Sequence, residues 1–247
     1  MTTAGMTTAE GSQPETDMMR QARSDTRFFR NLSWVVLAFV ILAFGGKAVL
    51  NSASLPPLTP MHHLHAVSML GWFALVAVQA SLIDTGRHSL HRTLGRLSPL
   101  LVIAFIVFAC FISQMNWDRV GDPLITTANA LFMCLFVGFY VAGVLQRRNT
   151  ATHRRLMVFA SLSFVGPAAG RIPEMFDANV LLSLPILLAF NLAPLIYDRF
   201  VRRQIERVTH VGTSLQIQAD TVKEALSELP PWVSLIEAVL GPGGLGG

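Results

Sequence analysis

The chain has 247 residues, of which 52% are hydrophobic and only 14% are charged, and its mean hydropathy is +0.49. Soluble domains carry roughly 25% charged residues, so this composition excludes an ordinary water-soluble globular protein. The net charge of +4 does not indicate a nucleic-acid-binding protein, because the arginines lie in short loops beside apolar segments and not in a patch with interleaved aromatic residues.

Long apolar segments separated by short arginine-rich loops predict an all-α protein, a polytopic membrane bundle of six transmembrane helices. We expect a flexible basic arm over residues 1–30 and the membrane bundle over 31–199. The individual spans are expected at residues 32–50, 62–83, 98–114, 123–145, 153–172 and 179–197.

The distribution of Lys and Arg predicts the orientation of the bundle. With the N-terminus inside, the inner segments hold 16 of the 19 basic residues, and the outer segments hold Lys47, Arg119 and Arg171. Basic loops stay on the cytoplasmic side. The sequence therefore predicts a multi-pass protein of the bacterial inner (plasma) membrane, surrounded by the lipid bilayer, with cytoplasmic N- and C-termini.

The C-terminal tail is expected to have two parts. Residues 200–229 carry a heptad-like pattern of apolar or small residues, at Val201, Ile205, Val208, Gly212, Leu215, Ala219, Val222, Leu226 and Leu229. Two interpretations stay open: a coiled coil that makes a homo-oligomer through 201–229, and an amphipathic helix on the membrane surface. Residues 230–247 are expected to form a short interfacial segment and a Gly-rich end.

The seven histidines lie toward the ends of the expected spans and not at their centres. His91 and His153 belong to separate elements on the inner side, and a bis-histidine haem needs two imidazoles at similar depth on different elements. A nearby carboxylate could orient an imidazole or ligate a metal, although Asp198 is also an ordinary helix end. We therefore predict a cytoplasmic-side site for haem b or a divalent metal, built from His91, His153, Asp198, Gln79 and His210.

A second histidine group lies at the outer end of the second span. His62 and His65 share one helix face, so they cannot approach an iron from opposite sides. They are candidate ligands for one metal ion together with a third ligand, and a solvated cluster at headgroup level is the alternative.

No catalytic residue is predicted. HExxH, GxSxG, ExxH and a Gly-rich phosphate loop are all absent, which argues against metalloproteases, serine hydrolases, di-iron proteins and nucleotide hydrolases. Cys110 and Cys134 lie in apolar segments without a metal-binding spacing, so both are expected to be structural.

The motifs HRxLG at 91–95, HRRLM at 153–157 and YDR at 197–199, followed by His210, occur in an order that resembles a group of uncharacterised bacterial multi-span membrane proteins. That group is distantly similar to transmembrane cytochromes b. The resemblance covers residues 60–212 and implies signature positions at His65, Gln79, His91, Arg92, His153, Arg154, Arg171, Asp198 and His210. Cytochromes b pair histidines on neighbouring helices near both faces, and this chain lacks a second outer helix with a histidine. The resemblance thus leaves room for an inner haem and argues against an outer one.

Three functions follow as hypotheses. The inner histidines favour a redox-type membrane protein. Asn129, Asn191 and the prolines of the last span would suit a transporter or a small-molecule-binding protein. The tail pattern would suit a membrane assembly protein. The sequence does not decide whether the chain is an enzyme.

Overall fold

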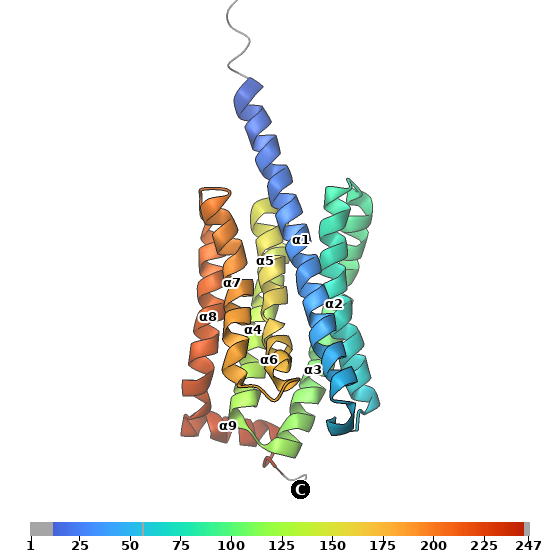
Figure 1. The fold of residues 1–247 in the computed structure, drawn as a ribbon, viewed down its shortest axis with the longest axis vertical. Coiled ribbons are helices and arrows are strands. Elements are labelled where there is room, and N and C mark those ends of the chain that lie inside the picture. Colours follow the sequence, from blue (N-terminus) through green and yellow to red (C-terminus); the bar gives the residue numbers. More distant parts are fainter. Residues whose placement is uncertain (1–11, 56, 245–247) are drawn as a thin grey trace, which may run out of the picture.

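The computed structural model describes residues 12–55 and 57–244, and within them every regular element is helical (Figure 1). The elements are α1 (Ser12–Leu50), η1 (Ser52–Ser54), α2 (Pro60–Asp84), α3 (His88–Val120), α4 (Pro123–Leu145), α5 (Thr150–Leu162), α6 (Val165–Glu174), η2 (Val180–Leu182), α7 (Ser183–Phe200), α8 (Arg207–Ser227) and α9 (Pro230–Leu240).

Six helical segments are long and apolar enough to cross a membrane, which confirms the predicted bundle of six transmembrane helices. They are Met18–Leu50, Pro60–Asp84, His88–Val120, Pro123–Leu145, Thr150–Glu174 and Val180–Phe200. The chain is thus a multi-pass membrane protein. The fifth span consists of α5 and α6, which are separated by Ser163 and Phe164.

Local sequence signals set several helix ends. Asp122 caps α4 by accepting a hydrogen bond from the backbone N–H of Leu124 at 2.8 Å, with Pro123 in the first turn. Gly121 ends α3 in the left-handed conformation at φ 64°, which a residue with a side chain rarely adopts. These two positions produce the short turn between α3 and α4.

The first helix is longer than predicted. α1 begins at Ser12, so the described part of the arm that was expected to be flexible continues the first span as a helix. Asp25 and Phe29, both within that arm, are 3% exposed. Burial of these two side chains against the bundle explains the order of this segment, and residues 1–11 lie outside the described part.

The tail helix α8 lies within the bundle, antiparallel to α7 and beside α4 (Figure 1). Its buried face is small or polar and includes Thr209, Thr213 and Gln216. The Gln216 amide donates to the carbonyl of Phe159 at 3.0 Å and to the Ser163 hydroxyl at 2.8 Å. This placement corrects the prediction of a separate cytoplasmic tail helix.

The outward face of α8 is mixed. Its exposed side chains include the apolar Val211, Leu215, Ile217 and Val222, and also Arg207, His210, Gln218 and Glu224. The buried polar groups of α8 find their partners inside the bundle, as polar groups within membrane proteins do. The heptad pattern is split by this packing, since Gly212 and Ala219 are buried against the bundle. A homo-oligomer through 201–229 stays a prediction.

The described ends of the chain lie at opposite ends of the bundle (Figure 1). The Trp232 indole N–H donates to the Thr127 hydroxyl at 2.7 Å, and the Trp117 indole N–H donates to the carbonyl of Gly241 at 2.8 Å. These contacts hold α9 where α3 meets α4, far from the start of α1. The described ends of the chain therefore lie at different ends of the bundle, and the side of the membrane on which each terminus lies stays a prediction.

Gly212 permits the close approach of α8 to α5. A Cβ atom at this position would lie 2.5 Å from two ring carbons of Phe159, whose side chain is 0% exposed. We expect Gly212→Ala to lower the free energy of unfolding by about 1–3 kcal/mol, because the buried ring has little room to move. Chemical unfolding in detergent micelles measures the change. Gly166→Ala is the control, since a Cβ atom there meets nothing within 4 Å, and equal losses in both variants would contradict this packing.

Candidate functional site

The structure brings His91 and His153 together at the end of the bundle where α1 starts. His91 lies in the first turn of α3 and His153 in the first turn of α5. Their ring centroids are 6.5 Å apart, with the two planes at 89°. Both side chains are half-buried. The pair predicted from the sequence is therefore adjacent in space.

Each of the two imidazoles is oriented by a backbone carbonyl. The Nδ1 atom of His91 lies 3.3 Å from the carbonyl oxygen of Gln79, and the Nδ1 atom of His153 lies 2.7 Å from that of Gly143. A carbonyl can only accept, so Nδ1 carries a proton in both rings, and in the neutral form of each imidazole Nε2 has a free lone pair. This tautomer is the one that ligates a metal through Nε2, and a carbonyl on the other nitrogen is its usual support.

Gln79 connects the second span to the His91 side of the site. Its side-chain amide donates to the backbone carbonyl of His91 at 3.1 Å, and its own backbone carbonyl accepts from the His91 ring. These two hydrogen bonds join α2 to α3 at this position. The Oε1 atom of Gln79 is buried and has no hydrogen-bond partner among the described residues. A buried acceptor without a donor is costly, so this position suits a water molecule or a protonated group of a ligand.

Two features of the chain position His153. The Asn149 side chain caps α5 by accepting from the backbone N–H of Thr152 at 3.2 Å, so the histidine lies in the first turn. Gly143 lets α4 approach closely, because a Cβ atom there would lie 2.7 Å from Cε of Met157. The close approach allows His153 to reach the carbonyl of Gly143.

Asp198 does not join the histidines, which corrects the predicted site. Its carboxylate is 0% exposed and forms a two-pronged ion pair with Arg155, with N–O distances of 2.5 and 3.2 Å. The Thr209 hydroxyl donates to the same carboxylate at 2.5 Å, and the backbone N–H of Glu206 donates at 3.2 Å. These hydrogen bonds commit the carboxylate to Arg155, Thr209 and Glu206 and not to either imidazole.

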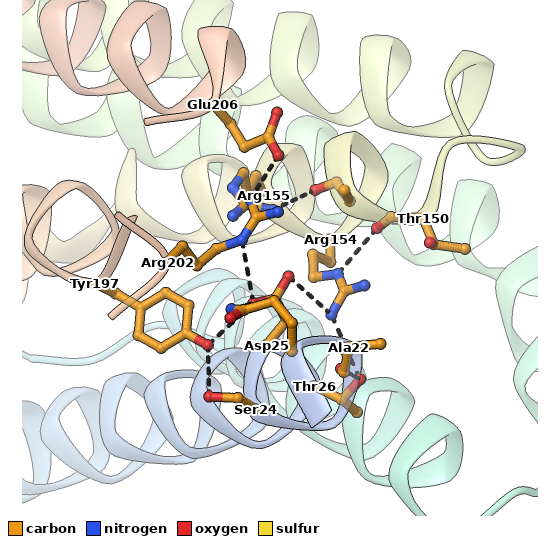
Figure 2. A network of polar contacts seen from close by, with 12 residues as sticks. Ala22, Ser24, Asp25, Thr26, Thr150, Arg154, Arg155, Tyr197, Arg202 and Glu206 are labelled. Atoms are coloured by element: carbon orange, nitrogen blue, oxygen red, sulfur yellow. Dashed lines mark hydrogen bonds and ion pairs between the residues drawn. The ribbon is translucent and has the colours of Figure 1, made fainter. Parts of the chain in front are cut away.

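The Arg155–Asp198 pair belongs to a larger polar network between α1, α5, α7 and the start of α8 (Figure 2). Tyr197 donates to Asp25 at 3.0 Å, and Arg202 pairs with Glu206 at 2.5 Å. Arg154 and Arg202 also lie 4.0 and 3.4 Å from Asp25. Three arginines thus face three carboxylates in a balanced cluster. Buried ion pairs of this kind hold helices in register, so we assign the network a structural role.

Arg202 keeps its charge in these surroundings. Burial disfavours the charged guanidinium, but the hydrogen bond to Glu206 and the charges of Asp25, Glu206 and Asp198 outweigh burial and raise the pKa of Arg202. Sequence inspection assigned no structural role to Asp25, which fell in the arm that was expected to be flexible, to Arg155, which was noted only within the HRRLM motif, or to Arg202, which was counted only as an orientation signal.

His210 does not join the histidine pair either. Its side chain is exposed on α8, and no hydrogen bond or ring contact links it to His91 or His153. The predicted inner group therefore reduces to the two imidazoles with Gln79 beside them.

The outer histidines serve local roles. The Nδ1 atom of His62 lies 2.8 Å from the Thr59 hydroxyl and accepts from the Thr59 backbone N–H at 3.2 Å, which caps α2. His65 stacks against Phe105 with ring centroids 5.8 Å apart. In the described ranges no group of three or more His, Cys, Asp or Glu side chains could hold a metal ion. The predicted outer metal site therefore lacks its third ligand.

Other polar residues that were noted in the spans make local contacts. Asn129 donates to the Ser113 hydroxyl at 3.2 Å and links α4 to α3. Asn191 is buried on α7: its backbone carbonyl accepts from the Thr213 hydroxyl of α8 at 3.3 Å, and its side-chain Oδ1 has no hydrogen-bond partner in the part of the chain that the structure describes. Arg171 pairs with Glu174 at 2.6 Å near the surface.

Comparisons with protein-family models, with curated proteins and with solved structures find no match for this chain. The resemblance to transmembrane cytochromes b therefore stays a prediction.

Proposed function

We propose that the chain is a membrane redox protein in which His91 and His153 would hold a haem b. The observation that carries the proposal is the pair of imidazoles on separate helices, with centroids 6.5 Å apart. Imidazole nitrogen binds a transition metal at about 2.0–2.1 Å, so two imidazoles that would hold one metal must lie within about 6 Å of each other. The observed separation agrees with that arrangement.

The number of protein ligands favours haem over a bare metal ion. Structural and catalytic zinc sites use three or four protein ligands, whereas a haem iron takes its equatorial ligands from the macrocycle and only one or two from the protein. Two imidazoles with Nε2 lone pairs match the number of protein ligands that a haem iron takes. A haem held by two imidazoles would supply electron transfer.

The charges around the site also suit haem, whose propionates are anionic. Arg92 directly follows His91, is exposed, and has no carboxylate partner in the described part of the chain. A guanidinium can form two hydrogen bonds to one carboxylate, so this residue is our candidate partner for a propionate.

The same end of the bundle faces the cytoplasm of a bacterial inner membrane in this proposal. With α8 placed in the bundle, this end holds 15 of the 19 basic residues, and the other end holds Lys47, Arg119, Arg171 and Lys223. Lys223 was counted with the inner segments from the sequence, and the packing of α8 in the bundle places it at the other end. The asymmetry still favours a cytoplasmic N-terminus.

The proposal is tested by expressing single variants with added haem, purifying them in detergent and measuring bound haem per chain. We expect His91→Ala and His153→Ala each to lose most of the haem, because one of the two side chains that would hold it is removed. His88→Ala and His210→Ala are matched controls on exposed histidines and should keep it. Size-exclusion elution and unfolding temperature verify that each variant is folded. Haem retained in folded His91→Ala and His153→Ala would contradict the assignment.

A further inference from the structure

An open cleft lies where α1 meets the end of α7. Its volume is about 480 Å³, and it is lined by Arg20, Arg23, Ser24, Arg27, Phe28 and Tyr197. The three arginines follow one another at intervals of three and four residues along α1, which puts them on one helix face. The cleft does not overlap the histidine pair.

The charge of the cleft is not balanced by its own lining. None of the described Asp and Glu side chains lines it. Asp25, the nearest carboxylate in sequence, is 3% exposed and is occupied by Tyr197, Arg154 and Arg202. Arg23 and Arg27 have no ion-pair partner among the side chains that the structure describes. The cleft therefore favours an anion.

The cleft has an apolar wall and apolar flanks. Phe28 stacks on Tyr197 with ring centroids 3.9 Å apart and planes at 8°, which joins α1 to α7 beside the cleft. Met19, one turn before Arg23, is 53% exposed, and Phe200, one turn after Tyr197, is 72% exposed. An anionic group that carries hydrocarbon chains would satisfy both the arginines and these exposed apolar side chains.

We propose that the cleft binds the phosphate headgroup of an anionic phospholipid. Guanidinium groups bind phosphate oxygens through paired hydrogen bonds, and basic side chains beside a span attract anionic lipids of the inner leaflet. A bound lipid would hold the basic half of α1 against α7, next to the network of Figure 2. Free phosphate offers the same oxygens without the hydrocarbon chains. An experiment can therefore distinguish a lipid headgroup from free phosphate as the anion in the cleft.

The test uses the full chain in a neutral detergent and a dialkyl phosphatidylglycerol, with the matching phosphatidylcholine as reference. Native mass spectrometry counts the retained lipids. We expect the phosphatidylglycerol adduct to dominate and the double variant Arg23→Gln with Arg27→Gln to weaken it about 30-fold. The control, Arg147→Gln with Arg148→Gln, removes the same charge from an exposed loop at the same end and should retain the adduct.

Three results would overturn the proposal. One is equal retention of the two lipids by the unmodified chain, and another is an equal loss in both double variants, which would indicate general charge attraction. The third is displacement of phosphatidylglycerol by inorganic phosphate at equal concentration, which would assign the cleft to a soluble anion. Bound haem is unaffected by either double variant in our account, so failure here is distinguishable from failure of the haem site.

Discussion

Arg155→Ala is expected to lower the free energy of unfolding by about 3–5 kcal/mol, because it leaves the Asp198 carboxylate buried without its partner. Both side chains are 0% exposed, so water cannot replace the lost guanidinium. The guanidinium also lies 5.0 Å from the ring of Phe29, and truncation removes that contact as well. Chemical unfolding in detergent, followed by circular dichroism, measures the change.

Two companion variants separate the buried charge from ordinary side-chain loss. Arg171→Ala breaks an Arg–carboxylate pair whose side chains are 40% and 42% exposed, and it should cost no more than about 1 kcal/mol. Replacing both Arg155 and Asp198, by Met and Leu respectively, should recover most of the stability lost in Arg155→Ala, because no charge is then left unpaired. A double variant less stable than Arg155→Ala would show that the network does more than balance charge.

A reporter fused after the last residue is expected to emerge on the opposite side of the membrane from one fused after Arg203. The reason is that α8 runs the length of the bundle and α9 binds at its far end, through Trp117 and Trp232. Alkaline phosphatase, active only outside the cytoplasm, should be active in the full-length fusion and inactive in the fusion that ends at Arg203. A fluorescent protein that matures only inside should give the opposite pattern.

If α8 were a cytoplasmic tail helix, both fusions would report the cytoplasmic side, and this result would contradict the placement of α8 in the bundle. Gln216→Leu provides an independent check, since the amide bonds two partners on α5 and its following turn. In the bundle, this change removes two buried hydrogen bonds and is expected to destabilise the fold by about 1–3 kcal/mol. On a helix outside the bundle it would have little effect.

The six spans were predictable because long apolar segments report lipid contact whatever their partners are. α8 was not, because it carries polar side chains on both its buried and its exposed face, so its hydropathy averaged over a window falls below that of a membrane span. A window average does not distinguish which face is buried. The buried polar face becomes visible only when Thr209, Thr213 and Gln216 are placed against their neighbours.

The histidine pair was predictable because the basic loops indicate which helix ends share a side of the membrane. The partner of Asp198 was not predictable, because it depends on how α5 is rotated about its axis. His153, Arg154 and Arg155 are consecutive, so their side chains point in three directions about 100° apart. His153 contacts α4, Arg154 faces Asp25 of α1, and Arg155 meets Asp198 of α7. The carboxylate pairs with the arginine two residues away and not with the imidazole.

The most direct test of the haem assignment is the absorption and electron paramagnetic resonance spectrum of the full chain, purified after expression with excess haem. Our account predicts one haem per chain with the low-spin spectrum of an iron that has two imidazole ligands. His153→Met should keep the haem and shift the spectrum, because a thioether replaces one imidazole. A folded chain that shows no haem absorption would contradict the assignment.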